Sequence, residues 1–199
     1  MSQPINPANL LRALRSYLND LDKAGAGDVL LSDKALLNLK NLESITRWPS
    51  HAGEENGPAT LEEIKKRLER VEGVPTLRDR MVFATGTPLS RLMFVGEAPG
   101  QEEEKQGEPF VGPAGKLLTR IIETMGMRRD EVYITNIVKF RPRVDGERQG
   151  TANRKPSPDE MRTFIPFLTD EINVVKPELI IALGGTAMAG LLGIESSVS

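Results

Sequence analysis

The sequence contains no cysteine and only one histidine, His51, among its 199 residues. Without cysteine the chain can form no disulfide bond, no zinc site built from thiolates and no cysteine-ligated iron–sulfur cluster. A single histidine also excludes a metal site that needs several imidazole ligands. His51 stands in a stretch rich in proline and glycine, where we expect it to be solvated. We therefore expect no metal site and no cofactor.

Long apolar runs and a strong net charge are missing as well. No stretch approaches the roughly 18 apolar residues of a transmembrane helix, and the first residues lack the apolar segment of a secretory signal. The net charge of −2, from 26 basic and 28 acidic residues, does not exclude a nucleic-acid partner, because a local basic stripe can contact phosphates. We expect a cytoplasmic protein built as one medium domain or as a domain with an appendage.

The first part of the chain has the periodicity of helices. Leucines recur at helical spacing in residues 7–23 and again in residues 32–42. A polar linker rich in turn residues follows at 48–58, and a capping box then opens a third helix over 60–71. We assign residues 1–75 to a helical extension with its linker. The apolar stripes of these helices indicate docking, either on this chain or on a protein partner.

The rest of the chain alternates between strands and helices. We expect strands at 92–95, 131–137 and 178–183, a short strand at 80–84, and helices at 115–125, 157–175 and from 184 onward. This alternation predicts a three-layer α/β/α fold with a short, mainly parallel sheet over residues 76–199.

The glycine-rich segment after Val95 is the first place to expect chemistry. Ligands bind outside the carboxyl ends of strands in open α/β sheets, and a connection of about 18 residues far exceeds the usual two to six. Phe110 within this loop argues against simple disorder. A phosphate-binding P-loop is excluded because Phe110 and Leu117 occupy positions that need Gly and Ser or Thr, and Ala98 breaks the dinucleotide fingerprint.

Three segments of the chain form a combined pattern. The first is Gly-Glu-Ala-Pro-Gly at 96–100 with Gly-Glu-Pro-Phe-Val-Gly-Pro-Ala-Gly at 107–115. The second is Tyr-Ile-Thr-Asn-Ile-Val-Lys at 133–139 followed by Arg-Pro, and the third is the Leu-Gly turn at 183–184. Together these segments resemble the uracil-DNA glycosylase superfamily, above all its thermostable family 4, whose members contain an iron–sulfur cluster. The resemblance covers about residues 80–193.

The resemblance implies an enzyme that flips uracil out of DNA and hydrolyses its N-glycosidic bond. Phe110 would stack on the flipped base, and the Asn136 amide would pair with O4 and N3–H of uracil. Glu97 and Ala98 would line the pocket wall. Glu103 would position water or stabilise the cationic sugar. We take Glu97 and Glu103 as the catalytic carboxylates.

Contacts with DNA phosphates are expected at two places. The long loop after the second strand is basic, and Lys139, Arg141 and Arg154 are its candidates for phosphate contacts. The alternative is a solvated loop. The backbone N–H groups of Gly184 and Gly185 open the last helix and could hold another phosphate, or simply form a close strand-to-helix turn.

The chain departs from the family pattern at three places. The cluster cysteines are missing, and Phe140 stands where the second motif would continue Lys-Cys-Arg-Pro, which indicates that packing replaces the cluster. The segment 144–152 is longer than in the family. The family's last strand and its His-Pro motif are absent, so we expect an incomplete α/β domain.

These departures leave an alternative function open, namely a weak or inactive superfamily member that binds nucleic acid or a nucleotide. A different small-molecule enzyme is the third alternative. We expect a bacterial-type, nucleoid-associated monomer whose partner is uracil-containing DNA.

Overall fold

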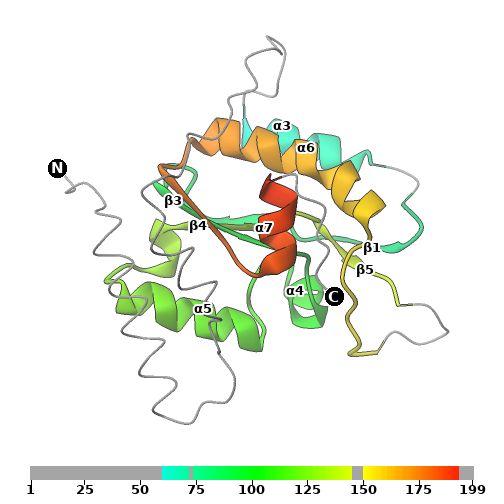
Figure 1. Ribbon diagram of the computed structural model, residues 1–199, viewed down its shortest axis with the longest axis horizontal. Coiled ribbons are helices and arrows are strands. Elements are labelled where there is room, and N and C mark those ends of the chain that lie inside the picture. Colours follow the sequence, from blue (N-terminus) through cyan, green and yellow to red (C-terminus); the bar gives the residue numbers. More distant parts are fainter. Residues whose placement is uncertain (1–59, 72–73, 145–149, 193–199) are drawn as a thin grey trace.

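The computed structural model describes residues 60–71, 74–144 and 150–192 (Figure 1). The expected helices at 7–23 and 32–42, the linker after them and His51 lie outside the described residues. The described elements are α3 (Leu61–Glu69), β1 (Leu77–Met81), β2 (Ala84–Gly86), β3 (Leu92–Gly96), α4 (Gln101–Gln106), α5 (Pro113–Thr124), the 3-10 turn η2 (Arg129–Glu131), β4 (Tyr133–Asn136), β5 (Phe140–Pro142), α6 (Pro158–Val175), β6 (Leu179–Ala182) and α7 (Gly185–Leu192). None of the described helices has the length and apolar character needed to cross a membrane.

The central sheet has four strands in the order β2-β4-β3-β6. β3, β4 and β6 run parallel, and only β2 is antiparallel to its neighbour. The register pairs Gly96 with Asn136 and Val95 with Ala182. The carboxyl ends of the three parallel strands therefore meet at one edge, as the expected mainly parallel sheet requires.

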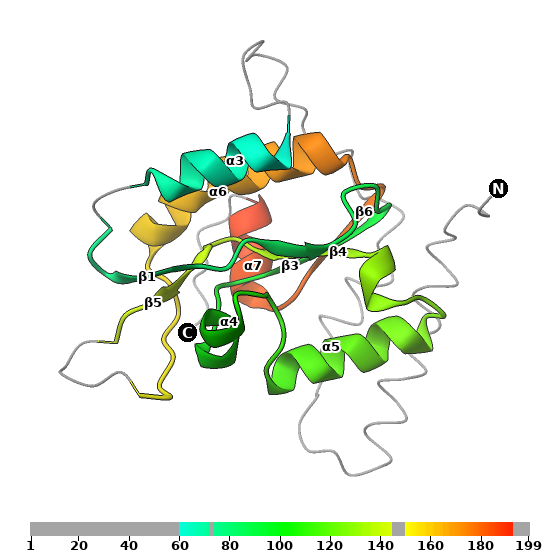
Figure 2. The ribbon, with the colours of Figure 1, turned by 180° about the vertical axis from the view of Figure 1, so that it is seen from behind.

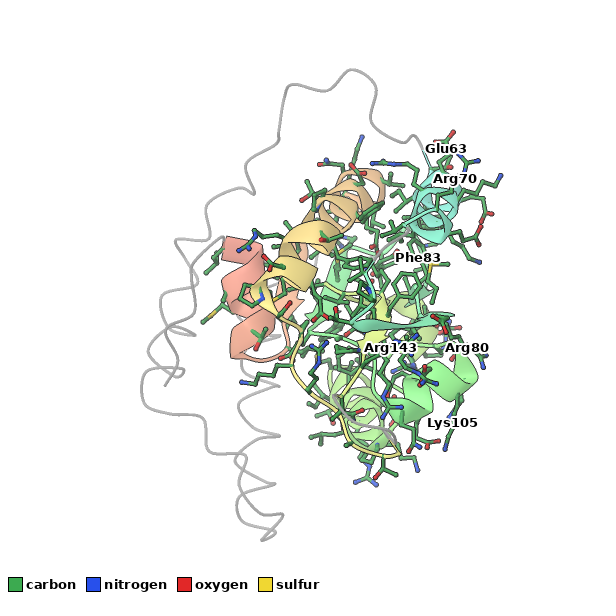
Figure 3. The ribbon with its side chains drawn as sticks, turned by 90° about the vertical axis from the view of Figure 1, so that its right-hand side faces the viewer. Glu63, Arg70, Arg80, Phe83, Lys105 and Arg143 are labelled. Atoms are coloured by element: carbon green, nitrogen blue, oxygen red, sulfur yellow. The ribbon has the colours of Figure 1, made fainter. Side chains whose placement is uncertain are left out.

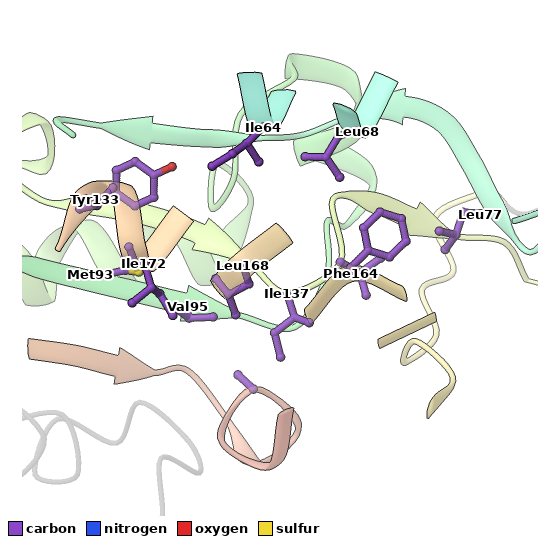
Figure 4. Close-up of a cluster of buried hydrophobic side chains, with 13 residues drawn as sticks. Ile64, Leu68, Leu77, Met93, Val95, Tyr133, Ile137, Phe164, Leu168 and Ile172 are labelled. Atoms are coloured by element: carbon purple, nitrogen blue, oxygen red, sulfur yellow. The ribbon is translucent and has the colours of Figure 1, made fainter. Parts of the chain in front are cut away.

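Helices cover both faces of this sheet, which makes three layers (Figures 1 and 2). Successive strand residues point to opposite faces, so Met93 and Val95 of β3 pack with α3, α6 and α7 in one core, part of which Figure 4 shows. Leu92 and Phe94 pack against α5 on the other face. The expected α/β/α architecture is confirmed.

The α3 helix docks on this same chain. Its capping box forms as expected, because Thr60 accepts a hydrogen bond from the Glu63 backbone and the Glu63 carboxylate accepts one from the Thr60 backbone. The buried Ile64 and Leu68 face α6 (Figure 4). Burying two such side chains stabilises the contact by about 1.5–3 kcal/mol each. The apolar stripe of this helix thus has its partner within the described fold.

The long loop after β3 contains a helix that the sequence pattern did not predict. α4 begins after Gly100 and ends at Gly107, whose φ of +80° suits glycine. Its first turn carries the acidic run Glu102 to Glu104, and negative charge is favourable at a helix N-terminus. The helix places Glu103 against the backbone of the residues that precede α5 and places Glu104 against arginines of β1 and β5.

Strand boundaries also differ from the expectation. The strand predicted at 131–137 spans only Tyr133–Asn136, because the 3-10 turn η2 includes Glu131 and the strand begins after it. The strand expected at 80–84 is divided between β1 and β2, and β1 pairs with β5 in a separate two-stranded ribbon. Figure 3 shows Arg80 and Arg143 at this ribbon, above Lys105 of α4.

Candidate active site

A hollow of about 680 Å³ opens at the carboxyl ends of β3 and β4. Its walls are residues 97–103, Phe110 with the start of α5, and residues 151 and 153–155, and Asn136 also lines it. The glycine-rich segment and the second sequence motif thus meet at the edge of the sheet where ligands bind in folds of this class. The structure brings Glu97, Ala98, Glu103, Phe110, Asn136 and Arg154 together around this hollow.

Asn136 is the last residue of β4 and lies opposite Gly96 of β3. It is only 2% exposed, and its carboxamide makes no hydrogen bond to the part of the chain that the structure describes. A Cβ added at Gly96 would lie 2.3 Å from Asn136 Oδ1, so only glycine leaves room for the amide here. Buried polar groups are nearly always paired, so an unpaired amide that lines a hollow indicates a ligand with a complementary donor and acceptor.

Phe110 adopts a left-handed backbone conformation, with φ of +56°. Such a conformation is strained for a residue with a Cβ and persists only where its surroundings impose it. A Cβ on Gly115 would lie 1.8 Å from the Phe110 carbonyl oxygen, and a Cβ on Gly96 would lie 2.4 Å from Cζ of the ring. Arg129 also donates a hydrogen bond of 2.6 Å to the carbonyl of Pro109. Backbone and ring are therefore both fixed.

Glu103 holds the same loop from inside. Its Oε1 accepts hydrogen bonds from the backbone N–H groups of Val111 at 3.1 Å and Gly112 at 2.9 Å. Gly112 is the N-cap of α5, so this carboxylate takes the place of a side-chain cap at a helix end that needs acceptors. Glu103 thus links α4 to the residues that follow Phe110. One of its oxygens is committed to the loop.

Glu97 is more open than Glu103. Its backbone carbonyl accepts a hydrogen bond of 3.1 Å from Val138 N–H, which anchors the residue beyond the end of β3. Its half-buried side chain lines the hollow and makes no hydrogen bond or ion pair with the described residues. Ala98 follows on the same wall. Glu97 is therefore a carboxylate with both oxygens available to a bound molecule.

Lys139 does not reach the surface, so the expectation that it contacts a phosphate is wrong. Its side chain is 0% exposed and forms an ion pair with the equally buried Glu171. Its Nζ also donates to Thr135 Oγ1 at 2.6 Å and to the Asn136 carbonyl at 2.5 Å. Tyr133 donates to the Glu171 carboxylate at 3.0 Å. Burial lowers the pKa of Lys139 and raises that of Glu171, while their mutual attraction opposes both shifts.

Arg141 is also buried and cannot contact DNA in this structure. It is 3% exposed, and its guanidinium donates to Asn153 Oδ1, to Glu104 Oε2 and to the carbonyls of Gly150 and Ala152. Burial raises the pKa of Glu104, but hydrogen bonds from two arginines outweigh it and lower the value. Arg141 therefore ties α4 to the loop after β5, and the expected phosphate contact is wrong.

Arg154 lines the hollow but is held in place by its neighbours. It donates to both oxygens of Glu160, at 2.8 and 2.7 Å, and to the carbonyl of Arg143. Burial raises the pKa of Glu160, yet hydrogen bonds that involve Arg154, Thr76 and Ser157 outweigh it and lower the value to about 2. With 30% of its side chain exposed, Arg154 keeps a face toward solvent, and its phosphate contact stays a prediction.

The two glycines of the last turn lie apart from the hollow. Gly184 and Gly185 are exposed where β6 passes into α7, and Gly184 has a φ of +99°. The positive φ explains the glycine at 184 as part of a close turn. Neither residue lines the hollow, so their contact with a phosphate stays a prediction.

Three residues of the site have roles that sequence reasoning missed. Arg129 reaches back to Pro109, Gly115 admits the Phe110 backbone, and Lys155 lines the hollow with an exposed ammonium. Lys155 belongs to the basic run that drew attention to Arg154, so its charge was a usable signal. The local sequence around Arg129 and Gly115 gives no signal of their contacts, because these contacts join residues that meet only in the folded chain.

The residues present do not fit a cysteine-ligated cluster. The chain has no cysteine, and its described part has no group of three or more metal-ligating side chains. Phe140, at the position where the resemblance led us to expect a cysteine, packs on Phe164 with ring centroids 5.7 Å apart. Leu68 and Leu77 pack in the same core. An aromatic and aliphatic contact thus joins β5 to α6 and α3 at this point.

Comparison with known proteins agrees with this geometry. Residues 83–198 match the family model of the uracil DNA glycosylase superfamily. The type-4 uracil-DNA glycosylase of Thermotoga maritima is 40% identical over 131 residues, which cover 65% of this chain and 64% of that protein. Those of Sulfurisphaera tokodaii and Pyrobaculum aerophilum are each 46% identical, over 63% and 62% of this chain. The matched segment spans 54% to 64% of these relatives' lengths. The chain belongs to the uracil-DNA glycosylase superfamily.

Proposed function

We propose that this protein is a DNA repair enzyme that hydrolyses the N-glycosidic bond of uracil in DNA. The observation that carries the proposal is the nearly buried, unpaired Asn136 carboxamide beside the fixed ring of Phe110. One amide offers a donor to O4 and an acceptor to N3–H of uracil. The ring offers a face for stacking, which contributes about 1–3 kcal/mol per base. The names of the type-4 relatives support the same substrate.

The base must leave the DNA stack before it can enter this hollow, which requires flipping. Asn136 and Phe110 then hold the uracil, the bond between N1 and the sugar C1′ breaks, and the electron pair leaves with the base. Water adds to the cationic C1′ and loses a proton, and the uracil anion gains one. The products are free uracil and an abasic sugar.

The two carboxylates take different parts in this proposal. Glu97, with both oxygens available, faces the reacting sugar and stabilises its positive charge or orients the attacking water. Glu103 holds the amides after Phe110 and so keeps the stacking ring in place. This division refines the expectation that Glu103 acts directly on the sugar or the water.

No iron–sulfur cluster takes part in this proposal. The contact between Phe140 and Phe164 supports a fold that is held by packing at this point. Uracil release should then be unchanged after treatment with an iron chelator, and the purified protein should contain no stoichiometric iron. We place this activity on chromosomal DNA in the cytoplasm.

The test is release of uracil from an end-labelled oligonucleotide, followed by alkali to cleave at abasic sites. Single-stranded and duplex DNA are compared, each with uracil, cytosine or thymine at one position. Cleavage at uracil alone is expected. The Leu89→Ser variant, altered at an exposed position outside the hollow, serves as the control and should match the wild type. A folded protein that binds uracil-containing DNA without cleaving it would instead favour a non-catalytic binding module.

A further inference from the structure

A network of buried polar side chains lies directly behind Asn136. It consists of Tyr133 and Thr135 of β4, Lys139 of the segment after β4, and Glu171 of α6. Each of these residues is at most 2% exposed. The Glu171 carboxylate accepts hydrogen bonds from Tyr133 and Thr135 and pairs with Lys139. The network is therefore ionic, and it lies inside a core that is otherwise apolar.

The ammonium group of Lys139 donates hydrogen bonds to Thr135 Oγ1 and to the Asn136 carbonyl. It also forms an ion pair with Glu171 Oε1, an oxygen that accepts no hydrogen bond from the described residues. The ring of Phe83 lies 5.7 Å from Nζ and is labelled in Figure 3. A completely buried ammonium cannot touch DNA or the base. Its influence on the reaction must pass through the groups that it holds.

The Asn136 carbonyl is the group through which Lys139 reaches the site. The ladder between β2 and β4 ends at the pair Ala84 and Thr135, one residue before Asn136. On the β3 side the chain is held by Ile137 N–H, which donates 2.9 Å to the Gly96 carbonyl. The carbonyl of Asn136 thus lies beyond the end of the β2–β4 ladder, and Lys139 donates a hydrogen bond to it.

Stability alone gives little reason to bury such a pair. The cost of removing two charges from water is large, and apolar side chains of similar size often make a fold equally stable. Removing one partner is damaging because it leaves the other charge buried and unpaired. This pair also contacts the backbone of Asn136, so its role is to be sought at the site as well as in stability.

We propose that Lys139 and Glu171 are positioning residues, which fix the backbone of Asn136 and so aim its carboxamide at the base. The role of Asn136 as the uracil reader is that of the proposed function, on which this inference rests. Glu171 anchors the ammonium to α6, and the ammonium holds the carbonyl at the end of β4. The rigid core thereby sets the direction of a side chain that has no hydrogen bond of its own among the described residues.

The test replaces the whole pair, in the double variant Lys139→Met/Glu171→Leu, so that no charge is left unpaired. Its matched control is Arg67→Met/Asp170→Leu, which removes the 2.7 Å ion pair between α3 and the residue preceding Glu171. Both variants should unfold cooperatively. We expect kcat on uracil-containing DNA to fall at least tenfold in the double variant, with KM within about threefold, because phosphate contacts are untouched. The control should keep the wild-type kcat.

A second readout does not depend on activity. The side-chain amide of Asn136 can be followed by NMR in protein labelled with ¹⁵N at asparagine and assigned by its loss in Asn136→Asp. Its signals should shift or broaden in Lys139→Met/Glu171→Leu and stay in place in the control. If the wild type releases no uracil, the proposed function fails, and this spectrum alone decides whether the pair fixes Asn136.

Two results would overturn the inference. One is a folded double variant with wild-type kcat and an unchanged Asn136 amide signal. The other applies if the double variant does not fold. Lys139→Gln, whose amide can still donate to the Asn136 carbonyl, is then compared with Lys139→Met. Equal activities of these two single variants would show that the donor to Asn136 has no role in positioning.

Discussion

The side chain of Asn136 offers both a donor and an acceptor to a base. Its amide nitrogen is the donor, and replacing this one atom by oxygen removes the match to uracil. Asn136→Asp replaces the donor by a charged oxygen that faces O4 of uracil. We expect kcat/KM on uracil to fall about 100-fold or more, which is typical for loss of a transition-state donor. Uracil release from the labelled oligonucleotide measures this change.

The matched control is Asn153→Asp. Asn153 lies at the same hollow, and its Oδ1 accepts from Arg141, an acceptor that aspartate keeps. This variant should change kcat/KM less than threefold. Equal losses in both variants would mean that added negative charge, and not base reading, causes the effect.

The roles of the two carboxylates of the first motif, Glu97 and Glu103, can be distinguished by replacing each with glutamine. Glu97→Gln removes a charge that faces the hollow without removing a hydrogen bond among the described residues. We expect kcat to fall about 100- to 1,000-fold with little change in the free energy of unfolding. Kinetics and urea unfolding on the same preparation give both quantities.

Glu103→Gln should behave differently, because Oε1 accepts from two backbone amides. An amide side chain keeps one acceptor oxygen but loses the charge that strengthens such hydrogen bonds. We expect a loss of about 1–2 kcal/mol in unfolding free energy together with a smaller fall in kcat than for Glu97→Gln. The opposite order of the two kcat values would restore Glu103 as the carboxylate that acts on the sugar.

At the scale of elements, the start of α5 decides where the stacking ring lies. A Cβ on Gly115 would lie 1.8 Å from the Phe110 carbonyl oxygen, so Gly115→Ala must push the loop away from the helix. We expect destabilisation of about 1–3 kcal/mol and a fall in kcat/KM greater than tenfold. Thr124→Ala, at the exposed far end of the same helix, should leave the activity unchanged.

The elements that the sequence predicts well are those with strong periodic or capping signals. The buried strand at 92–95 and the helix at 157–175, with its cap at Ser157, are found within one or two residues. α4 was missed because six residues between glycines carry no hydrophobic periodicity. β5 was missed, and β1 was predicted only in its last two residues, because a short strand depends on its partner in the ribbon, which local sequence does not reveal.

The sequence predicted the site residues that belong to a motif at the end of a strand. It did not predict which charged side chains are buried by partners from other elements. Phe110 and Asn136 meet at one hollow because their motifs follow adjacent parallel strands. Lys139 and Arg141 looked like surface cations, since sequence shows a charge but not the partner that buries it. Their partners Glu171 and Glu104 come from α6 and α4, and only the folded chain brings them together.

For the molecule as a whole, Glu160 is the described carboxylate whose protonation should matter most in acid. It is buried beside Arg154 at the start of α6, where it also completes the cap on Ser157. Its pKa is about 2 in the folded chain, against an ordinary 4.5. A depressed pKa stabilises the fold above pH 4.5, and this contribution is lost as the pH falls toward 2.

Glu160→Gln should therefore flatten the acid limb of the stability curve. We expect the variant to be less stable than the wild type by about 1–3 kcal/mol at neutral pH, with the difference shrinking between pH 4.5 and pH 2. Urea unfolding at a series of pH values measures this difference in stability.

Glu63→Gln is the matched control, because Glu63 has the same place in the capping box of α3 but stands at the surface. This control separates the loss of the capping contact, which both variants share, from the loss of the ion pair between Glu160 and Arg154. A Glu160→Gln curve parallel to the wild type would show that other groups govern acid unfolding.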